Sequence, residues 1–325
     1  MSVYAGFDFG GTQLKYGLID DSGKILFKDK TRTPPTIREV MSLLKNLWND
    51  LKKKERQKIK AVGFGFPGIY SLKEKKIYQS PNYRELDNFN LFSAIGEFIE
   101  VPFWVDNDAN MAAFGEWKCG AGRGVSSMVF LTLGTGIGGG IIIGGKLWQG
   151  SCGYAGELGH IIVNPRGELC NCGIQGCLET EASAPAIVRK YLTLIKSQGP
   201  VSAEEIYQRA QQGEENARMA FAEAGYYLGI GLGIIINFLN PEKILLGGGV
   251  MTTGEFLLRP AVEEAGRRSY KASFSCCSIK RASLGNDAGL IGAASWAQEK
   301  LKELDYNPKI WIFPICCFLD SSITR

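Results

Sequence analysis

The feature that most restricts how this chain can fold is a unit that occurs twice: an apolar strand, a glycine-rich turn and a second strand. The first copy covers residues 3–20 (VYAGFDFGGTQLKYGLID), and the second covers residues 126–148 (SSMVFLTLGTGIGGGIIIGGKLW). β-Branched and aromatic residues on both sides of the glycines favour paired strands. Apolar residues at helical spacing follow each copy, over 37–54 and then over 183–196 and 216–238. The sequence therefore predicts an α/β protein with an internal duplication.

Two common nucleotide-binding signatures are excluded. Residues 134–139 (GTGIGG) satisfy G-x-G-x-x-G, but the β-branched run that follows them is a strand, whereas the dinucleotide fold needs a helix there. Residues 140–146 (GIIIGGK) satisfy G-x4-G-K, but Leu147 stands where a P-loop needs a serine or threonine for magnesium. The glycines therefore belong to turns between strands.

Turns of this kind expose successive backbone N–H groups and let phosphate oxygens approach without interference from a Cβ atom. Asp8 lies in the apolar strand that leads into the first turn, where an unpaired charge is costly. Two interpretations of Asp8 stay open. Its carboxylate either accepts backbone N–H groups of the turn, or it orients Mg²⁺ and its waters against a triphosphate.

The segment 156–183 (GELGHIIVNPRGELCNCGIQGCLETEAS) contains the single histidine of the chain, His160, followed by Cys170, Cys172 and Cys177. Glycines at 173 and 176 permit a tight turn between the cysteines. Three thiolates and one imidazole form a closed tetrahedral Cys3His set, which predicts structural Zn²⁺; reduced thiols on a surface loop are the alternative.

A zinc ion with four protein ligands has no open position for water, so the predicted ion is architectural and not a catalytic Lewis acid. It would fix the orientation of His160 and leave the second imidazole nitrogen available to a substrate. Glu157 and Glu179 are candidates to converge on the same place. The alternative is that they are solvated, since the ETEAS stretch also resembles a helix start, where acidic residues favour the dipole.

Transfer of a phosphoryl group to a hydroxyl requires a group that accepts the hydroxyl proton. If the triphosphate considered for Asp8 donates its phosphoryl group in this way, the base must be a carboxylate, since the only histidine is assigned to zinc. Residues 102–117 (PFWVDNDANMAAFGEW) predict a short strand and then a helix, with Asp106, Asn107 and Asp108 at the junction, where residues of α/β folds face a ligand crevice. From these residues alone, Asp108 is equally well explained as a helix N-cap.

The glycine turns resemble those of the sugar kinase, actin and Hsp70 superfamily, and the cysteine segment resembles the ROK family (repressor, open reading frame, kinase). GELGH is followed by CNCGIQGCLE, which matches C-x-C-G-x-x-G-C-x-E at every fixed position, and NDAN matches the kinase motif of the family. The resemblance spans the chain except for its tail. It implies two ribonuclease-H-like α/β domains with a cleft between them.

The resemblance also implies residue functions. It makes Asp108 the general base and places a hexose on Asn107, Glu157, His160 and Glu179. It implies ATP with Mg²⁺ near Asp8, with contacts to the phosphates and the adenosine from seven residues: Gly10, Gly11, Thr12, Thr135, Gly136, Gly248 and Gly249.

We expect residues 1–115, completed by a C-terminal helix over 288–305, to form a smaller α/β domain. Residues 116–287 form a larger one that carries the zinc loop. The tail, 306–325, has no assigned role. Its apolar part (IWIFPICCF) is short and interrupted by Pro314, and no apolar run approaches the ~20 residues that span a bilayer. The chain begins without a signal peptide, so we expect a cytoplasmic protein with reduced thiols and no membrane partner.

The function predicted from these features is ATP-dependent phosphorylation of a hexose, with glucose favoured because CLETEASAPAI is similar to bacterial glucokinases. A kinase for fructose, mannose, allose or N-acetylmannosamine is the first alternative, and a non-catalytic sugar-sensing regulator is the second. A regulator would carry a DNA-binding domain before residue 8, for which we expect no room. The net charge of +4 is too small and too dispersed to indicate nucleic acid. We expect a homo-oligomer, either a dimer or a tetramer.

Overall fold

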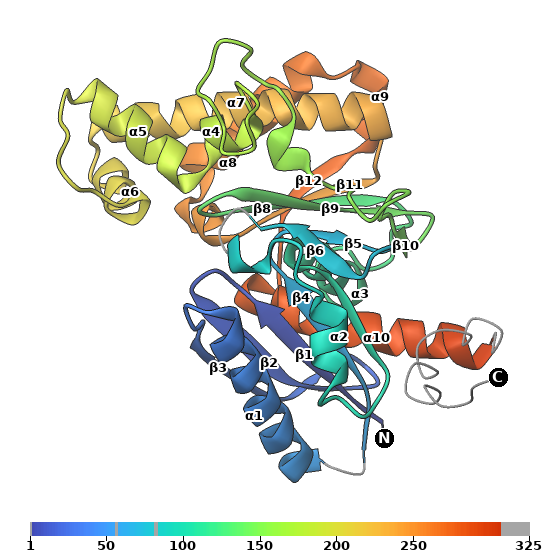
Figure 1. Cartoon of the computed structure of the whole chain (residues 1–325). Coiled ribbons are helices and arrows are strands. Elements are labelled where there is room, and N and C mark those ends of the chain that lie inside the picture. Colours follow the sequence, from blue (N-terminus) through green and yellow to red (C-terminus); the bar gives the residue numbers. More distant parts are fainter. Residues whose placement is uncertain (1, 56–57, 81–83, 307–325) are drawn as a thin grey trace, which may run out of the picture.

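The computed structural model describes residues 2–55, 58–80 and 84–306, so nearly all of the predicted tail lies outside the described residues. Two lobes, each built on a five-stranded sheet, lie one above the other in Figure 1. The first sheet contains β1 (Val3–Phe9), β2 (Gln13–Asp20), β3 (Ile25–Arg32), β4 (Ile59–Phe66) and β7 (Phe103–Asn107). The second contains β8 (Met128–Leu133), β9 (Ile137–Ile143), β10 (Lys146–Leu147), β11 (Lys243–Gly247) and β12 (Ser278–Arg281).

The two sheets have the same topology. Their strand orders are β3-β2-β1-β4-β7 and β10-β9-β8-β11-β12, and in each the first three strands are antiparallel while the last three are parallel. The glycine turns join the strand at the centre of each sheet to its antiparallel neighbour. The predicted duplication is therefore confirmed at the level of topology, and both turns lie at the carboxyl end of a central strand.

Helices cover both faces of each sheet, which explains why the central strands are apolar without alternation. Along β1, Val3, Phe7 and Phe9 pack toward α1, whereas Tyr4 packs toward α10. The helices are α1 (Ile37–Glu55), α2 (Leu91–Gly96), α3 (Asp108–Cys119), α4 (Leu178–Ala182), α5 (Ala184–Leu194), α6 (Ala203–Gln211), α7 (Glu215–Leu239), α8 (Glu255–Arg268), α9 (Lys271–Cys276) and α10 (Ala288–Tyr306). The helices α2, α8 and α9, the edge strand β12 and the small hairpin of β5 (Ile69–Ser71) and β6 (Lys76–Gln79) were not predicted from the sequence.

Two helices, α3 and α10, lie between the sheets (Figure 1). They share a core cluster in which Met111 and Phe114 of α3 meet Trp296 of α10 and Phe130 of β8. The two helices approach each other very closely at Gly292. A Cβ atom there would lie 1.7 Å from the carbonyl oxygen of Met111, so only glycine fits. We propose the domain division given above, with α10 completing the first lobe; its boundary at residue 115 falls inside α3.

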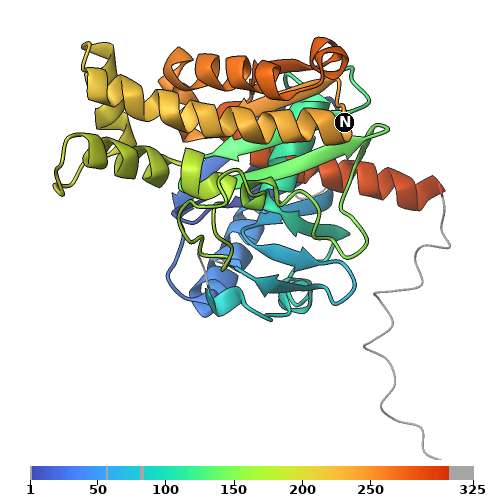
Figure 2. The same cartoon turned by 90° about the horizontal axis from the view of Figure 1, so that it is seen from above.

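One expectation about membranes needs correction. Among the described residues, α7 is long and apolar enough by length and composition to cross a membrane, which the sequence analysis did not register. In the structure, 61% of its most apolar window is buried, against α5 and α8 of the second lobe (Figure 2). Such burial is typical of the core helix of a globular lobe.

Candidate active site

The two glycine turns are tight, and each contains a glycine with empty space beside its Cα atom. In the first, the Gly10 N–H donates to the carbonyl of Gln13 over 2.9 Å, and a Cβ atom on Gly11 would meet nothing within 4 Å. In the second, the Gly134 N–H donates to the carbonyl of Gly136 over 2.9 Å, and the position of a Cβ on Gly134 is likewise open. Both turns therefore leave room for a ligand beside the backbone.

Asp8, near the end of β1, is buried and faces Lys15 on β2. Lys15 Nζ lies 3.3 Å from Asp8 Oδ2, so this ammonium group is a partner of the carboxylate. Burial raises the pKa of Asp8, and the charge of Lys15 counteracts that rise. The carboxylate also packs on the first turn of α10, where a Cβ on Gly289 would lie 2.5 Å from Asp8 Cγ.

The N-cap of α3 is Asn107, not Asp108. Asn107 Oδ1 accepts hydrogen bonds from the N–H groups of Ala109 at 2.8 Å and Asn110 at 3.1 Å. Asn107 Nδ2 donates to the carbonyl of Gly68 over 2.9 Å, which ties the cap to the loop after β4. Asp108 is the first helical residue, so the capping interpretation of Asp108 is wrong and its carboxylate is not needed to begin the helix.

Asp108 lies among other carboxylates. Burial, followed by the negative charges of Asp8 and Glu157, raises its pKa to about 7, against the lowering effect of the hydrogen bond from the N–H of Ala109. Glu157 in turn has a pKa raised by burial and by Glu179. The structure therefore brings together Asp8 of the first sheet, Asp108 of α3 and Glu157 of the second lobe. A carboxyl group whose pKa lies near neutrality is suited to accept a proton at physiological pH.

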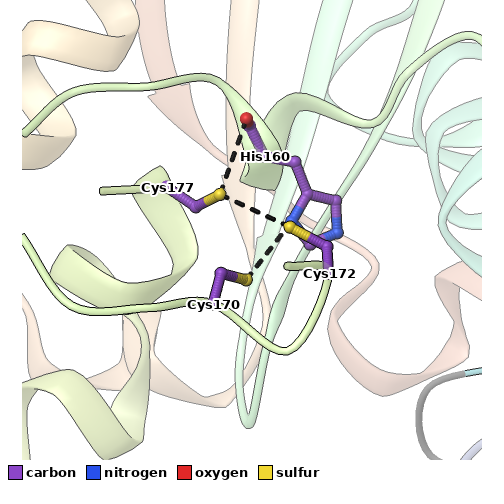
Figure 3. A group of neighbouring side chains, drawn as sticks. All are labelled: His160, Cys170, Cys172 and Cys177. Carbon is purple, nitrogen blue, oxygen red and sulfur yellow. Dashed lines mark hydrogen bonds between the residues drawn. The ribbon is translucent and has the colours of Figure 1, made fainter. Parts of the chain in front are cut away.

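The predicted metal ligands converge. The ligand atoms of His160, Cys170, Cys172 and Cys177 all lie within 4.8 Å of one another (Figure 3). His160 Nδ1 is 3.6 Å from Cys170 Sγ, and Cys172 Sγ is 3.6 Å from Cys177 Sγ. Ligands at the usual zinc distances of about 2.0–2.3 Å form a tetrahedron whose edges are about 3.4–3.8 Å. The four side chains fit a tetrahedral ion with little movement.

Local backbone geometry explains how the cysteines reach one point. Gly173 and Gly176 have φ angles of +87° and +80°, in the region that favours glycine, as expected from their place between the cysteines. A Cβ on Gly176 would also lie 1.7 Å from the carbonyl oxygen of Asn164. Burial raises the pKa of the Cys170 thiol, so an ion that binds here must displace its proton.

The other imidazole nitrogen points away from the cysteines. His160 Nε2 lies 3.9 Å from Glu157 Oε2, so the ring connects the cysteine cluster to the carboxylate group. Glu179, in the first turn of α4, is not merely solvated. Its Oε2 accepts the N–H of Ile137 over 2.9 Å, and a Cβ on Gly136 would lie 2.4 Å from this oxygen. Glu179 therefore links the cysteine segment to the second glycine turn.

A groove that was not predicted from the sequence lies next to the second glycine turn. It has a volume of about 880 Å³, and it is lined by Thr135, Ala184, Pro185, Val188, Arg189, Leu192, Thr193, Lys196, Ser197 and Gln198. All but one of these residues lie on α5 or just beyond it. The available signal was the basic residues Arg189 on that helix and Lys196 just beyond it, but helical spacing alone does not show which element a helix faces.

The third glycine run, at the end of β11, lies at the same end of the second sheet. Gly248 has a φ angle of +87°, and a Cβ there would lie 2.2 Å from the carbonyl oxygen of Leu133, just before the second turn. Gly249 has nothing within 4 Å of its Cβ position. The run thus packs on the strand that leads into the second glycine turn, and it leaves open space beside Gly249.

Two lobes of one topology, with a glycine turn at the carboxyl end of each central strand, define the fold of the sugar kinases, actin and Hsp70. The chain belongs to the ROK family, whose profile matches residues 4–300.

The chain is 37% identical over 309 residues to a glucokinase of Halalkalibacterium halodurans, covering 89% of this chain and 93% of the relative. Among solved structures it is similar to a ROK family glucokinase from Streptomyces griseus in complex with glucose and AMPPNP. The identity is 34% and the TM-score 0.78, over 92% of this chain and all of the other. It is also similar to the ROK hexokinase of Thermus thermophilus, with 32% identity and a TM-score of 0.83, over 93% and 99% of the two chains.

Proposed function

We propose that this protein is an ATP-dependent hexose kinase that converts glucose to glucose 6-phosphate. The observation that carries the proposal is the position of Asp108, a carboxyl group of pKa about 7 that lies in the electrostatic range of Asp8 and Glu157. The names of the relatives, which include glucokinases at 34–37% identity, support the choice of glucose.

In the proposed mechanism, Asp108 accepts the proton of the sugar hydroxyl as the hydroxyl oxygen bonds to the γ-phosphorus of ATP. The bond between that phosphorus and the β,γ-bridging oxygen breaks, and ADP leaves. Asn107, Glu157, His160 and Glu179 hold the other hydroxyls, and the contact of His160 with Glu157 supports their acting on one ligand. A base held beside the hydroxyl by a rigid cap needs no reorganisation when the proton moves.

The proposed ATP site uses both glycine turns. Gly10, Gly11 and Thr12 contact phosphates from one lobe, and Thr135 and Gly136 contact them from the other. Mg²⁺ bound with ATP would neutralise phosphate charge, and Asp8 is the residue that would orient it. Gly248 and Gly249 lie beside the adenosine, and the open position at Gly249 supports this. The groove that Thr135 shares with α5 offers further apolar surface to the adenosine.

We propose Zn²⁺ at His160, Cys170, Cys172 and Cys177, on the strength of their convergence and spacing. When bound, the ion would supply a rigid cross-link within a loop that contains few apolar residues. The contact with the sugar would come from the protein itself, because His160 presents Nε2 on the side of Glu157. Loss of the ion would therefore act on sugar binding and on stability, and not directly on proton transfer.

The pKa of Asp108 predicts the pH dependence of the reaction. Below about pH 7 the carboxyl group holds a proton and does not accept another, so kcat/KM for glucose should fall about tenfold per pH unit on the acid side and level off above the pKa. The measurement is a pH–rate profile at saturating ATP. A rate independent of pH from about 5.5 to 8 would contradict the assignment of Asp108 as the base.

The substrate is tested with a panel of sugars. ADP release is measured with ATP and each of glucose, mannose, fructose, allose and N-acetylmannosamine, and we expect the highest kcat/KM with glucose. A higher kcat/KM with another hexose would replace glucose as the substrate and leave the mechanism intact. No ADP release with any of them would contradict the proposed function.

We further propose a cytoplasmic protein that assembles as a dimer or tetramer and has small-molecule partners. Exposed apolar side chains on the second lobe support self-association, since Phe238 of α7 and Leu169 of the cysteine segment are 84% and 73% exposed. Light scattering coupled to size-exclusion chromatography measures the assembly. A monomer at micromolar concentration would contradict this proposal.

A further inference from the structure

Asp106 is a buried carboxylate for which the mechanism above has no use. It is the penultimate residue of β7, two residues before the proposed base, and it is 2% exposed. Asp106 Oδ1 accepts the N–H of Asn107 at 2.7 Å and Asn110 Nδ2 at 2.9 Å, and Asp106 Oδ2 accepts Gln149 Nε2 in a short contact. All three donors are neutral amides. Burial raises the pKa of Asp106, against the hydrogen bonds and the charge of Lys300 that lower it, so a carboxylate here is costly unless its donors are well placed.

Two of these donors fasten the first turn of α3. Asn107 and Asn110 flank Asp108, so the Asp106 carboxylate holds the helical turn that presents the proposed base. Asn110 is 2% exposed, and its Oδ1 has no hydrogen-bond partner among the described residues. The amide nevertheless keeps its nitrogen on Asp106. The opposite orientation would place an amide oxygen against the carboxylate, and two acceptors repel each other.

The third donor comes from the other lobe. Gln149 follows β10, at the start of the loop that leads to Glu157, and is 43 residues from Asp106 in sequence. The carbonyl of Gln149 accepts the N–H of Ala155 at 3.1 Å, which closes this loop on itself. Gly156 at its end packs on β9, with its Cβ position 2.9 Å from the carbonyl oxygen of Gly139. The position of the Gln149 side chain is thereby coupled to the backbone just before Glu157.

The same loop contacts the first lobe again at the β5–β6 hairpin. The N–H of Leu72 donates to the carbonyl of Cys152 over 3.2 Å, and the rings of Tyr78 and Tyr154 lie 6.2 Å apart. These contacts are at the surface, since Cys152 and Tyr78 are exposed. The Asp106–Gln149 contact is the less exposed end of this interface between the lobes, since Asp106 is buried and Gln149 half-buried, so water weakens it less than the surface contacts.

We propose that Asp106 and Gln149 form a latch between the lobes that positions the base on α3 against the sugar-binding loop of the second lobe. The inference rests on the proposed function, because it concerns the same sugar site. Asp106 and Gln149 are positioning residues: they act through Asp108 and Glu157. The placement they control matters because a misplacement of about 1 Å at a reacting group can cost about 100-fold in rate.

The test exchanges the donor and acceptor across the latch. Gln149→Glu sets a second carboxylate against Asp106, so we expect kcat/KM for glucose to fall about 10- to 100-fold. Asp106→Asn alone should have a small effect, because the Gln149 amide can rotate to present its oxygen. The double variant Asp106→Asn/Gln149→Glu restores one donor and one acceptor, and it should recover to within about threefold of the wild type.

The KM values separate positioning from a general loss of structure. Loss of the latch should raise KM for glucose and leave KM for ATP unchanged, whereas partial unfolding lowers the active fraction and changes neither. Gln211→Glu is the matched control, since Gln211 on the distant helix α6 also donates through Nε2, to Tyr207 at 3.0 Å, but is exposed. We expect wild-type kinetics for this variant.

Wild-type kcat/KM in Gln149→Glu, or a double variant no better than Gln149→Glu, would overturn the latch. Failure of the proposed function gives a different pattern, in which the wild type phosphorylates none of the hexoses. The unfolding temperatures of the wild type, both single variants and the double variant then still decide on the contact. A decrease in Gln149→Glu that the second substitution reverses supports it, and additive effects overturn it.

Discussion

Replacing Asp108 by alanine is expected to lower kcat for glucose phosphorylation by a factor of about 10²–10⁴, the usual contribution of a general base. The fold should survive, because Asn107 and not Asp108 caps α3. The raised pKa of Asp108 shows that the native environment disfavours its ionised form, so removing the carboxylate should not lower stability at pH 8. Steady-state kinetics and thermal unfolding measure the two effects.

Asp50→Ala is the matched control, since Asp50 lies on α1 with a side chain that is 58% exposed and forms a salt bridge with Lys53 at the surface. It should change neither kcat nor KM. Near wild-type turnover in Asp108→Ala would remove Asp108 as the base. A large loss of turnover together with a large decrease in the unfolding temperature would show that the residue acts on the fold instead.

Replacing Cys172 by serine is expected to reduce bound zinc from about one ion per chain to a small fraction. Changes to residues that only support a ligand cost about 10–100-fold in metal affinity, and here a ligand itself is lost. Because the free energy of metal binding is also folding free energy, the unfolding temperature should fall as well. Elemental analysis of the purified protein and thermal unfolding are the measurements.

Cys276→Ser is the control for this substitution, because Cys276 is an exposed free cysteine on α9, outside the cysteine cluster. It should keep both the zinc and the unfolding temperature of the wild type. KM for glucose should rise in Cys172→Ser, since His160 and Glu157 lose their common support. If the wild-type protein contains no zinc, the architectural role assigned to the ion is wrong.

Much of the candidate site could be predicted from the preferences of residues that are near one another in sequence. The glycine turns, the strand that contains Asp8 and the cysteine spacing each depend on residues that are near in sequence, where conformational preference and short reach decide the geometry. The convergence of His160 with the three cysteines was predicted for this reason, and the ligand atoms do meet. The interpretation of Asp108 as the N-cap of α3 was wrong by one residue, because the cap is Asn107.

Contacts between distant segments were not predictable in this way. The groove along α5, the contact of Glu179 with the N–H of Ile137, and the partnership of Asp106 with Gln149 each join elements that the topology brings together. A helix pattern shows that one face is buried, but not which strand or loop lies opposite. The apolar helix α7 shows the same limit, because only its place in the second lobe identifies it as a core helix.

The amino-acid sequence by itself determined the duplicated glycine turns, the metal-ligand spacing and the candidate base at a strand–helix junction, because these follow from backbone preferences and side-chain chemistry over a few residues. Only the tertiary structure decided which carboxylates share one environment and raise the pKa of Asp108 to about 7. That value depends on burial and on charges from both lobes, and neither exists until the chain has folded.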